Sequence, residues 1–370
     1  MTSTAASRSY RLISSDSHVN EPPDLWQSRV PAKFRDRAPR VERFDEGDAW
    51  ILEGVSDPVN FGWNACAGLE PEDMKGWVRF DDIRRGGYDP AARVEEMTRD
   101  RVDAEVLYPT PRLSQSITSN TDSELHLAMI RAYNDWLSEY VSYAPERFAG
   151  LAMLPNCGVE HAVDELDRVM SRPGMRGVLI SAYPNGTLEP EPDDDKVWAR
   201  LAEAGIPLNI HVQMTLGLPS AHRSKLPGFG RFYDAPNRMV QMVFSGMLDR
   251  FPDLQIAIAE VDCGWVPYVK EQIDNNYLRL ATVNGYDLEL LPSEYIERHF
   301  HFGYISDAAG IDNRARIGVE RILWSSDYPH ISADWPNSWR TIEAVFSGVP
   351  RAERDLILAG NAARLYGFGR

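Results

Sequence analysis

Short apolar runs recur along the chain, and most are followed by a segment whose apolar residues return with a helical period. A run of four to eight such residues between turn signals is typical of a buried strand. The pattern predicts eight strands, at Arg11–Val19, Ala104–Pro109, Phe148–Leu154, Gly177–Ala182, Pro207–Val212, Gln255–Glu260, His299–Gly303 and Arg321–Ser326.

The segments between these runs repeat apolar residues every three or four positions, as an amphipathic helix does. Because strands and helices alternate, the pattern predicts an α/β fold, a distorted (β/α)8 TIM barrel, with a doubly wound open sheet as the alternative. The clearest helices are expected at Ser123–Tyr143, Gly158–Met170, Asp194–Glu203, Asn237–Ser245 with a continuation to Phe251, and Trp265–Leu280.

The stretch from Trp26 to Asp89 breaks the alternation, because it combines several tryptophans with many charges and turn signals. We interpret it as an insertion after the first strand. The chain is therefore predicted to be a single barrel domain over residues 1–370, with a rim subdomain at about 27–90. The aromatic side chains of the insertion either line a pocket or hold the subdomain together.

Polar side chains end four of the predicted strands. Asp16 and His18 stand two positions apart, so on a strand they point to the same face. His211 ends the fifth strand, Glu260 the sixth and Asp327 the eighth. Taken singly, each has an ordinary explanation, as a helix cap or a hydrogen-bonded core histidine. Together they lie where the catalytic face of a barrel would collect them.

These five residues are predicted to bind a divalent metal. Imidazole and carboxylate ligands without a thiolate suit zinc, manganese or iron, in a site of one ion or two. An ion with an open position lowers the pKa of a bound water. Asp327 is expected to act as the general base, and His211 and Glu260 to take part in catalysis.

Charge and composition exclude several other classes. The formal net charge is −16, which argues against a nucleic-acid or anionic-membrane partner. The three cysteines form no CxxC pair, which disfavours a disulfide framework and favours a cytoplasmic location. Neither a signal peptide nor a membrane span is expected from the apolar runs. No glycine loop of the phosphate-cradling type is found, so the expected partner is a small-molecule substrate without a nucleotide cofactor.

Four stretches of the sequence form recognisable motifs. They are Asp16-Ser17-His18 with Glu21-Pro22-Pro23-Asp24-Leu25-Trp26, Asn209-Ile210-His211, Trp324-Ser325-Ser326-Asp327-Tyr328-Pro329-His330, and Gly360-Asn361-Ala362-Ala363-Arg364-Leu365-Tyr366. Together they resemble the amidohydrolase-2 branch of the amidohydrolase superfamily, which includes aminocarboxymuconate-semialdehyde decarboxylase and related aromatic-acid decarboxylases. The resemblance implies a distorted barrel with a divalent metal and, in many members, a homodimer. It also implies that Asp16, His18, His211 and Asp327 are metal ligands.

The chain departs from the branch at the sixth strand. The decarboxylases carry a histidine there, whereas this chain has Glu260. A carboxylate at this place either binds metal or anchors a water or a substrate hydroxyl. The fourth strand ends Ser181-Ala182-Tyr183, so the carboxylate or modified lysine that bridges two metals in the superfamily is missing.

Three further residues are secondary candidates for substrate contact or ligand support. His330 follows Asp327 by three positions, and Glu21 belongs to the first motif. His222 lies in a basic loop after the fifth strand, where it either meets an anionic substrate or is solvated.

Three functions follow from this set. The first is a metal-dependent hydrolase that uses a metal-activated water on an amide, ester or thioester carbonyl of a bulky, largely apolar molecule. The alternative is a non-oxidative, metal-dependent decarboxylase of an aromatic or conjugated carboxylic acid. The third is a barrel that holds a closed structural ion and has no catalytic activity.

Overall fold

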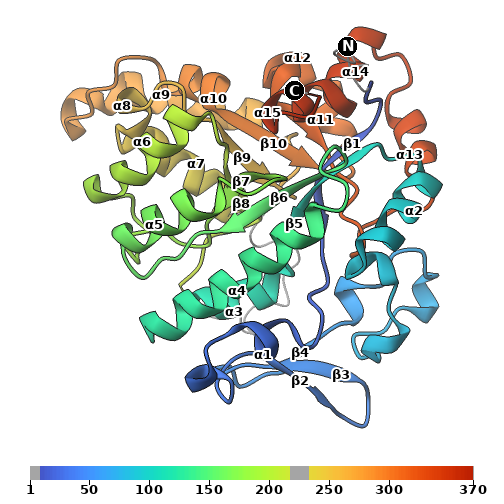
Figure 1. Ribbon diagram of the computed structural model, residues 1–370. Coiled ribbons are helices and arrows are strands. Elements are labelled where there is room, and N and C mark those ends of the chain that lie inside the picture. The colour runs from blue at the N-terminus through green and yellow to red at the C-terminus, as the bar shows by residue number, and fades with distance from the viewer. Residues whose placement is uncertain (1–8, 217–232, 370) are drawn as a thin grey trace, which may run out of the picture.

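The computed structural model describes residues 9–216 and 233–369, and a parallel eight-stranded sheet forms its centre (Figure 1). The strands follow one another in chain order, so each pairs with the next in the order β1-β5-β6-β7-β8-β9-β10-β11. Their bounds are β1 Ile13–His18, β5 Ala104–Tyr108, β6 Phe148–Met153, β7 Met175–Leu179, β8 Leu208–His211, β9 Ile256–Ala259, β10 Phe300–Tyr304 and β11 Ile322–Trp324.

The helices lie between the strands and cover the outside of the sheet (Figure 1). This arrangement confirms the predicted barrel over the doubly wound sheet. The helix bounds are α1 Leu25–Arg29, α2 Pro90–Asp100, α3 Pro111–Thr118, α4 Ser123–Val141, α5 Val159–Val169, α6 Asp195–Ala204, α7 Ala235–Phe244, α8 Met247–Arg250, α9 Val266–Asn284, α10 Pro292–His299, α11 Ala308–Asp312, α12 Arg314–Ile317, α13 Ser338–Val345, α14 Arg351–Asp355 and α15 Asn361–Leu365.

Several predicted elements differ from the observed ones by a few residues at their ends, and two of the differences are instructive. The helix expected to continue from Ser245 to Phe251 breaks instead at Gly246, whose φ of 71° lies in the left-handed region that glycine adopts at little cost. The fourth central strand, β7, ends at Leu179 and not at Ala182. Ile180 remains buried after the strand, so the apolar pattern outlasts the strand pairing.

A serine cluster closes the barrel between β1 and β11. The hydroxyl of Ser14 lies 3.0 Å from that of Ser326, and Ser15 lies 3.0 Å from Ser325 in the same way. The backbone N–H of Asp327 donates to the carbonyl of Asp16 over 3.0 Å. The first and last strands are thereby held together just where the polar motifs begin.

The interior of the barrel is filled by small and branched side chains, as in other closed barrels of this size. Helix α15 covers the end where the strands begin, and Tyr366 from its C-terminal end reaches inward to donate to Asn209 Oδ1 over 2.7 Å. The inner cluster also contains Ile13, Ala104, Val106, Tyr108, Ala149, Leu151, Leu179, Ala257, Ala259, Leu323, Ala359, Ala362 and Phe368.

The segment between β1 and β5 adds a second, three-stranded antiparallel sheet at the opposite end of the molecule from the chain termini (Figure 1). It consists of β2 Arg40–Arg43, β3 Asp48–Ile51 and β4 Val59–Asn60. Trp50 packs edge-on against Trp26 at 5.0 Å between ring centroids, and Trp50 and Phe61 are buried in the main hydrophobic core. These aromatic side chains therefore hold the insertion to the barrel.

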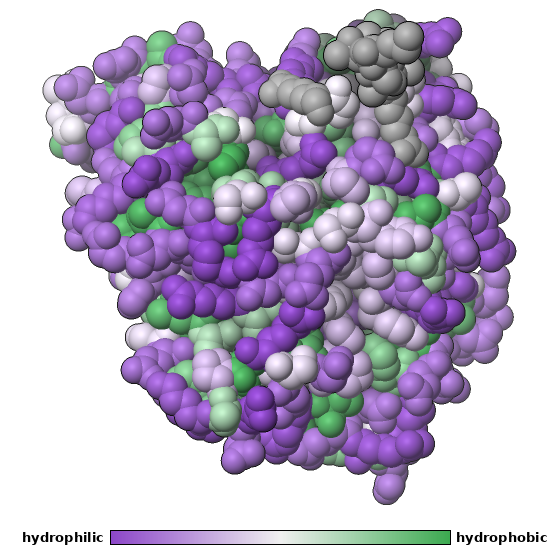
Figure 2. Space-filling model, viewed as in Figure 1, coloured by the Kyte–Doolittle hydropathy of each residue, from purple (hydrophilic) through white to green (hydrophobic). Residues whose placement is uncertain are grey.

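The surface in the view of Figure 2 is mostly hydrophilic, with hydrophobic residues in small separate areas. None of the described helices is long and apolar enough to cross a membrane.

Candidate metal centre

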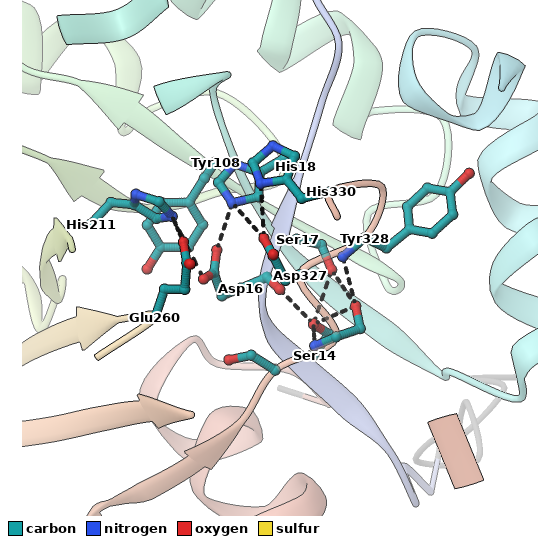
Figure 3. A network of polar contacts seen from close by, with 12 residues as sticks. Ser14, Asp16, Ser17, His18, Tyr108, His211, Glu260, Asp327, Tyr328 and His330 are labelled. Atoms are coloured by element: carbon teal, nitrogen blue, oxygen red, sulfur yellow. Dashed lines mark hydrogen bonds and ion pairs between the residues drawn. The ribbon is translucent and has the colours of Figure 1, made fainter. Parts of the chain in front are cut away.

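The side chains that end β1, β8, β9 and β11 converge on one point (Figure 3). The Nε2 atom of His18 lies 3.2 Å from Asp16 Oδ1 and 3.3 Å from Asp327 Oδ1. The Nε2 atom of His211 lies 3.7 Å from Asp16 Oδ2 and 3.4 Å from Glu260 Oε2. All five residues that the sequence places at strand ends are thus brought together.

The cluster is buried. Asp16 and His18 have no exposed surface, and Asp327 is almost as deep, whereas the Glu260 side chain retains 20% of its exposure. Glu260 therefore lies on the side of the cluster that is nearest to solvent.

Several potential ligand atoms of the cluster make no well-aligned hydrogen bond, although they lie close to one another. They are Oδ1 and Oδ2 of Asp16, Nε2 of His18, Nε2 of His211 and Oδ1 of Asp327. Buried polar groups are rarely left in this state, because each lost hydrogen bond costs about 1–3 kcal/mol. One ligand atom from each of Asp16, His18 and His211 lies within 4.8 Å of the others, and the same holds for Asp16, Glu260 and Asp327. These residues fit a divalent cation.

The protonation of His211 agrees with this fit, whereas His18 has to release a proton to the solvent when it binds an ion. Burial lowers the pKa of His211 to about 4, so the ring is neutral near pH 7, as a metal ligand must be. Burial also lowers the pKa of His18, but the carboxylates of Asp16 and Asp327 outweigh it and raise that pKa to about 10. Two carboxylates that hold a proton this firmly on His18 offer the same negative charge to a metal ion.

His330 also belongs to the cluster. Its Nδ1 lies 2.9 Å from Asp327 Oδ1, and its ring stacks on that of His18 at 3.8 Å between centroids. Burial raises the pKa of Asp327, but His330 and His18 overcome this effect and hold the pKa well below its usual range. Asp327 is therefore present as a carboxylate.

The backbone is unusual at two of the candidate ligands. Glu260 has a φ of 56° and Asp327 a φ of 52°, both in the left-handed region that side chains other than glycine seldom adopt. Such conformations cost on the order of 1–3 kcal/mol and gather at functional sites. In both cases the strand has just ended, and the turn directs the carboxylate toward the cluster (Figure 3).

Nearly the whole chain matches one family model. The model for amidohydrolases aligns with residues 16–368. This chain belongs to the amidohydrolase family. The match confirms the resemblance that the strand-end motifs indicate, and it includes every candidate ligand named above.

Individual relatives of this amidohydrolase are distant. The 2-amino-3-carboxymuconate-6-semialdehyde decarboxylase of Dictyostelium discoideum is 24% identical over 78% of this chain and 79% of its own length. An amidohydrolase structure from Mycobacterium avium subsp. paratuberculosis superposes with a TM-score of 0.76 at 22% identity, over 97% of this chain and 99% of that one. A dihydroxybenzoic acid decarboxylase from Polaromonas, solved with manganese and 2-nitroresorcinol, gives 0.67 at 21% identity over 98% of both chains.

The secondary candidates have different places in this amidohydrolase. Glu21 is buried beside the cluster, where its Oε1 accepts from the Thr110 N–H over 3.0 Å and burial raises its pKa to about 6. His222 lies outside the described residues. The ring of His18 is oriented through its Nδ1, which lies 3.0 Å from the Pro109 carbonyl oxygen.

Arg93 is a supporting residue that the sequence reasoning missed. It is fully buried in α2, its Nε donates to Glu105 over 2.6 Å, and its Nη1 donates to the carbonyl of His18 over 2.9 Å. Its guanidinium also lies over the ring of Tyr328, 4.3 Å from the centroid. One buried cation thus connects the backbone of the first motif to the residue that follows Asp327.

Proposed function

We propose that this amidohydrolase is a metal-dependent decarboxylase of an aromatic or conjugated carboxylic acid. The observation that carries the proposal is the buried cluster of Asp16, His18, His211 and Asp327, whose potential ligand atoms suit a divalent cation. Two similar proteins favour decarboxylation over other uses of such a cluster. The Dictyostelium relative is named as a decarboxylase, and the Polaromonas decarboxylase was solved with manganese.

The four residues would hold a cation whose positive charge binds the substrate carboxylate and withdraws electrons from the bond that breaks. When carbon dioxide leaves, the electron pair of that bond stays on the substrate carbon, which must then take up a proton. We assign the proton transfer to Glu260, which would enter this step as the carboxylic acid and leave it as the carboxylate. Its Oε2 lies 3.4 Å from His211 Nε2, and among the described candidate residues its side chain is the most exposed to solvent.

A second candidate function is hydrolysis of an amide, ester or thioester. Glu260 is the observation that favours it, because a carboxylate stands where the decarboxylases resembled by the sequence carry a histidine. A carboxylate close to Asp16 and Asp327 is a suitable base for activating a water.

The two functions are separated by one pair of assays. The protein loaded with manganese or zinc is incubated with hydroxybenzoic acids and unsaturated dicarboxylic acids, and carbon dioxide release is measured. A parallel panel of esters, thioesters and amides is followed for hydrolysis. Carbon dioxide release without hydrolysis is the expected result, whereas hydrolysis without carbon dioxide would establish the second candidate.

Variants of Glu260 sharpen the test. Glu260→Gln removes the proton carrier and should abolish turnover while the metal content is kept. Glu260→His restores a proton carrier and should preserve decarboxylation, but it should not support hydrolysis by a carboxylate base. Glu139→Gln is the matched control, because the Glu139 side chain is 61% exposed on the outer helix α4.

A further inference from the structure

A cavity lies at the end of the barrel opposite to the metal cluster. Its volume is about 620 Å³, within the range of about 300–1,000 Å³ that is typical of small-molecule sites. Gln255 precedes β9, His301 lies near the start of β10, and Arg321 precedes β11, so the cavity opens where these strands begin. Arg364 from α15 completes this side of the wall.

The wall carries more positive than negative charge, although the chain as a whole is strongly acidic. Four cationic side chains line it against two carboxylates, those of Glu297 and Glu320. One of the cations, Lys270, forms an ion pair with Glu297. The remaining cations are Arg316, Arg321 and Arg364.

Two of these arginines form no ion pair with a carboxylate in the described part of the chain. An Nη1 hydrogen of Arg321 goes to Gln255 Oε1 over 3.0 Å, and an Nη2 hydrogen of Arg364 goes to Asn361 Oδ1 over 3.0 Å. Both guanidinium groups therefore lack a direct carboxylate contact, and among the described carboxylates only the more distant charges of Glu320 and Glu297 act on Arg321. Burial lowers the pKa of Arg321, and the nearby charge of Arg364 lowers it further.

A buried histidine contacts Arg321. His301 is only 7% exposed, and its Nδ1 has no hydrogen-bond partner. Its other ring nitrogen, Nε2, lies 3.1 Å from Nη1 of Arg321. The same Nε2 lies 3.1 Å from Gln255 Oε1, so it donates to that oxygen in one tautomer and accepts from Arg321 in the other. His301 thus belongs to the hydrogen-bond network of Arg321 and Gln255 in the cavity wall.

We propose that this cavity binds a small anionic molecule through a carboxylate or phosphate group held by Arg321 and Arg364. Planar guanidinium groups bind both anions with paired hydrogen bonds, which are stronger than hydrogen bonds between neutral groups. Because the site shares no residue with the metal cluster, the proposal is independent of the reaction that the cluster catalyses.

The test is a calorimetric titration of the metal-loaded protein with inorganic phosphate, with malonate, and with chloride at matched ionic strength. Saturable binding of phosphate or malonate with a Kd below about 1 mM is expected, and chloride should give no binding. Binding of phosphate would point to a ligand with a phosphate group, and binding of malonate to a ligand with carboxylate groups. If neither anion binds saturably, the proposal is wrong.

Three variants locate the binding. Arg321→Gln and Arg364→Gln should each weaken it by about tenfold or more. Arg364 is exposed, so its variant remains informative if the change at Arg321 impairs folding. Arg351→Gln is the control, because that side chain is 93% exposed and lies beside Arg354 and Trp339, away from this cavity. Binding that survives both cavity substitutions would come from elsewhere, such as the metal centre, and would overturn the proposal.

Discussion

Arg93 Nη1 donates a hydrogen bond to the backbone carbonyl of His18 over 2.9 Å, and both residues are fully buried. The same guanidinium is paired with the buried carboxylate of Glu105. Removing one partner of a buried ion pair costs roughly 3–5 kcal/mol, because the other charge is left uncompensated. Arg93 therefore contributes to the stability of the barrel and to the placement of a candidate ligand.

We expect Arg93→Met to lower the free energy of unfolding by roughly that amount and to weaken metal binding. The double variant Arg93→Met with Glu105→Met removes both charges and should recover much of the stability, because no buried charge is left alone. It should not recover metal affinity, since the support of the His18 carbonyl is still missing. Urea denaturation and metal titration of both variants check this prediction. Full recovery of metal affinity in the double variant would contradict the positioning role.

Asp16 is expected to be the most sensitive ligand, because it faces both histidines. Its Oδ1 lies 3.2 Å from His18 Nε2, and its Oδ2 lies 3.7 Å from His211 Nε2. Asp16→Asn keeps the shape of the side chain but removes its charge. Loss of a residue that only supports ligands already costs about 10–100-fold in metal affinity, so loss of the ligand charge should cost at least about 100-fold.

Metal content after dialysis against a calibrated chelator measures this effect. Asp355→Asn is a suitable control, because the Asp355 side chain is 68% exposed on α14. Unchanged metal content in the Asp16 variant would remove Asp16 from the ligand set.

The serine cluster between the first and last strands makes a separate prediction about stability. Ser326 donates its backbone N–H to Ser14 Oγ over 2.9 Å, and its hydroxyl lies 3.0 Å from those of Ser14 and Ser17. Ser326→Ala leaves buried polar partners without a hydrogen bond, which costs about 1–3 kcal/mol. A double-mutant cycle with Ser14→Ala should give a coupling energy of about 0.5–3 kcal/mol in urea denaturation. Additive losses would show that the two hydroxyls act independently.

The candidate residues at strand ends could be predicted from the sequence, whereas the buried charged residue on a helix could not. Asp16 and His18 share a face because of the two-residue period of a strand, and this period is local. Arg93 lies on α2 among charged residues that look like a solvated helix face. Its burial depends on Glu105, on the carbonyl of His18 and on Tyr328, which is 235 residues away in the chain. Contacts between residues so far apart along the chain leave no periodic signal in the sequence.

A buried histidine away from the metal centre should make the protein sensitive to acid. Burial lowers the pKa of His126 to about 4, from a usual value of 6.5, and its Nε2 accepts from the Asn156 N–H over 3.4 Å. Between these two pH values the unfolded chain binds a proton that the folded chain does not. The free energy of unfolding should therefore fall as the pH drops from about 6.5 to 4, by roughly 3 kcal/mol from this residue. His126→Gln retains an acceptor but does not titrate, so it should flatten the pH dependence measured by urea denaturation over this range. An unchanged slope would assign the acid sensitivity to other groups.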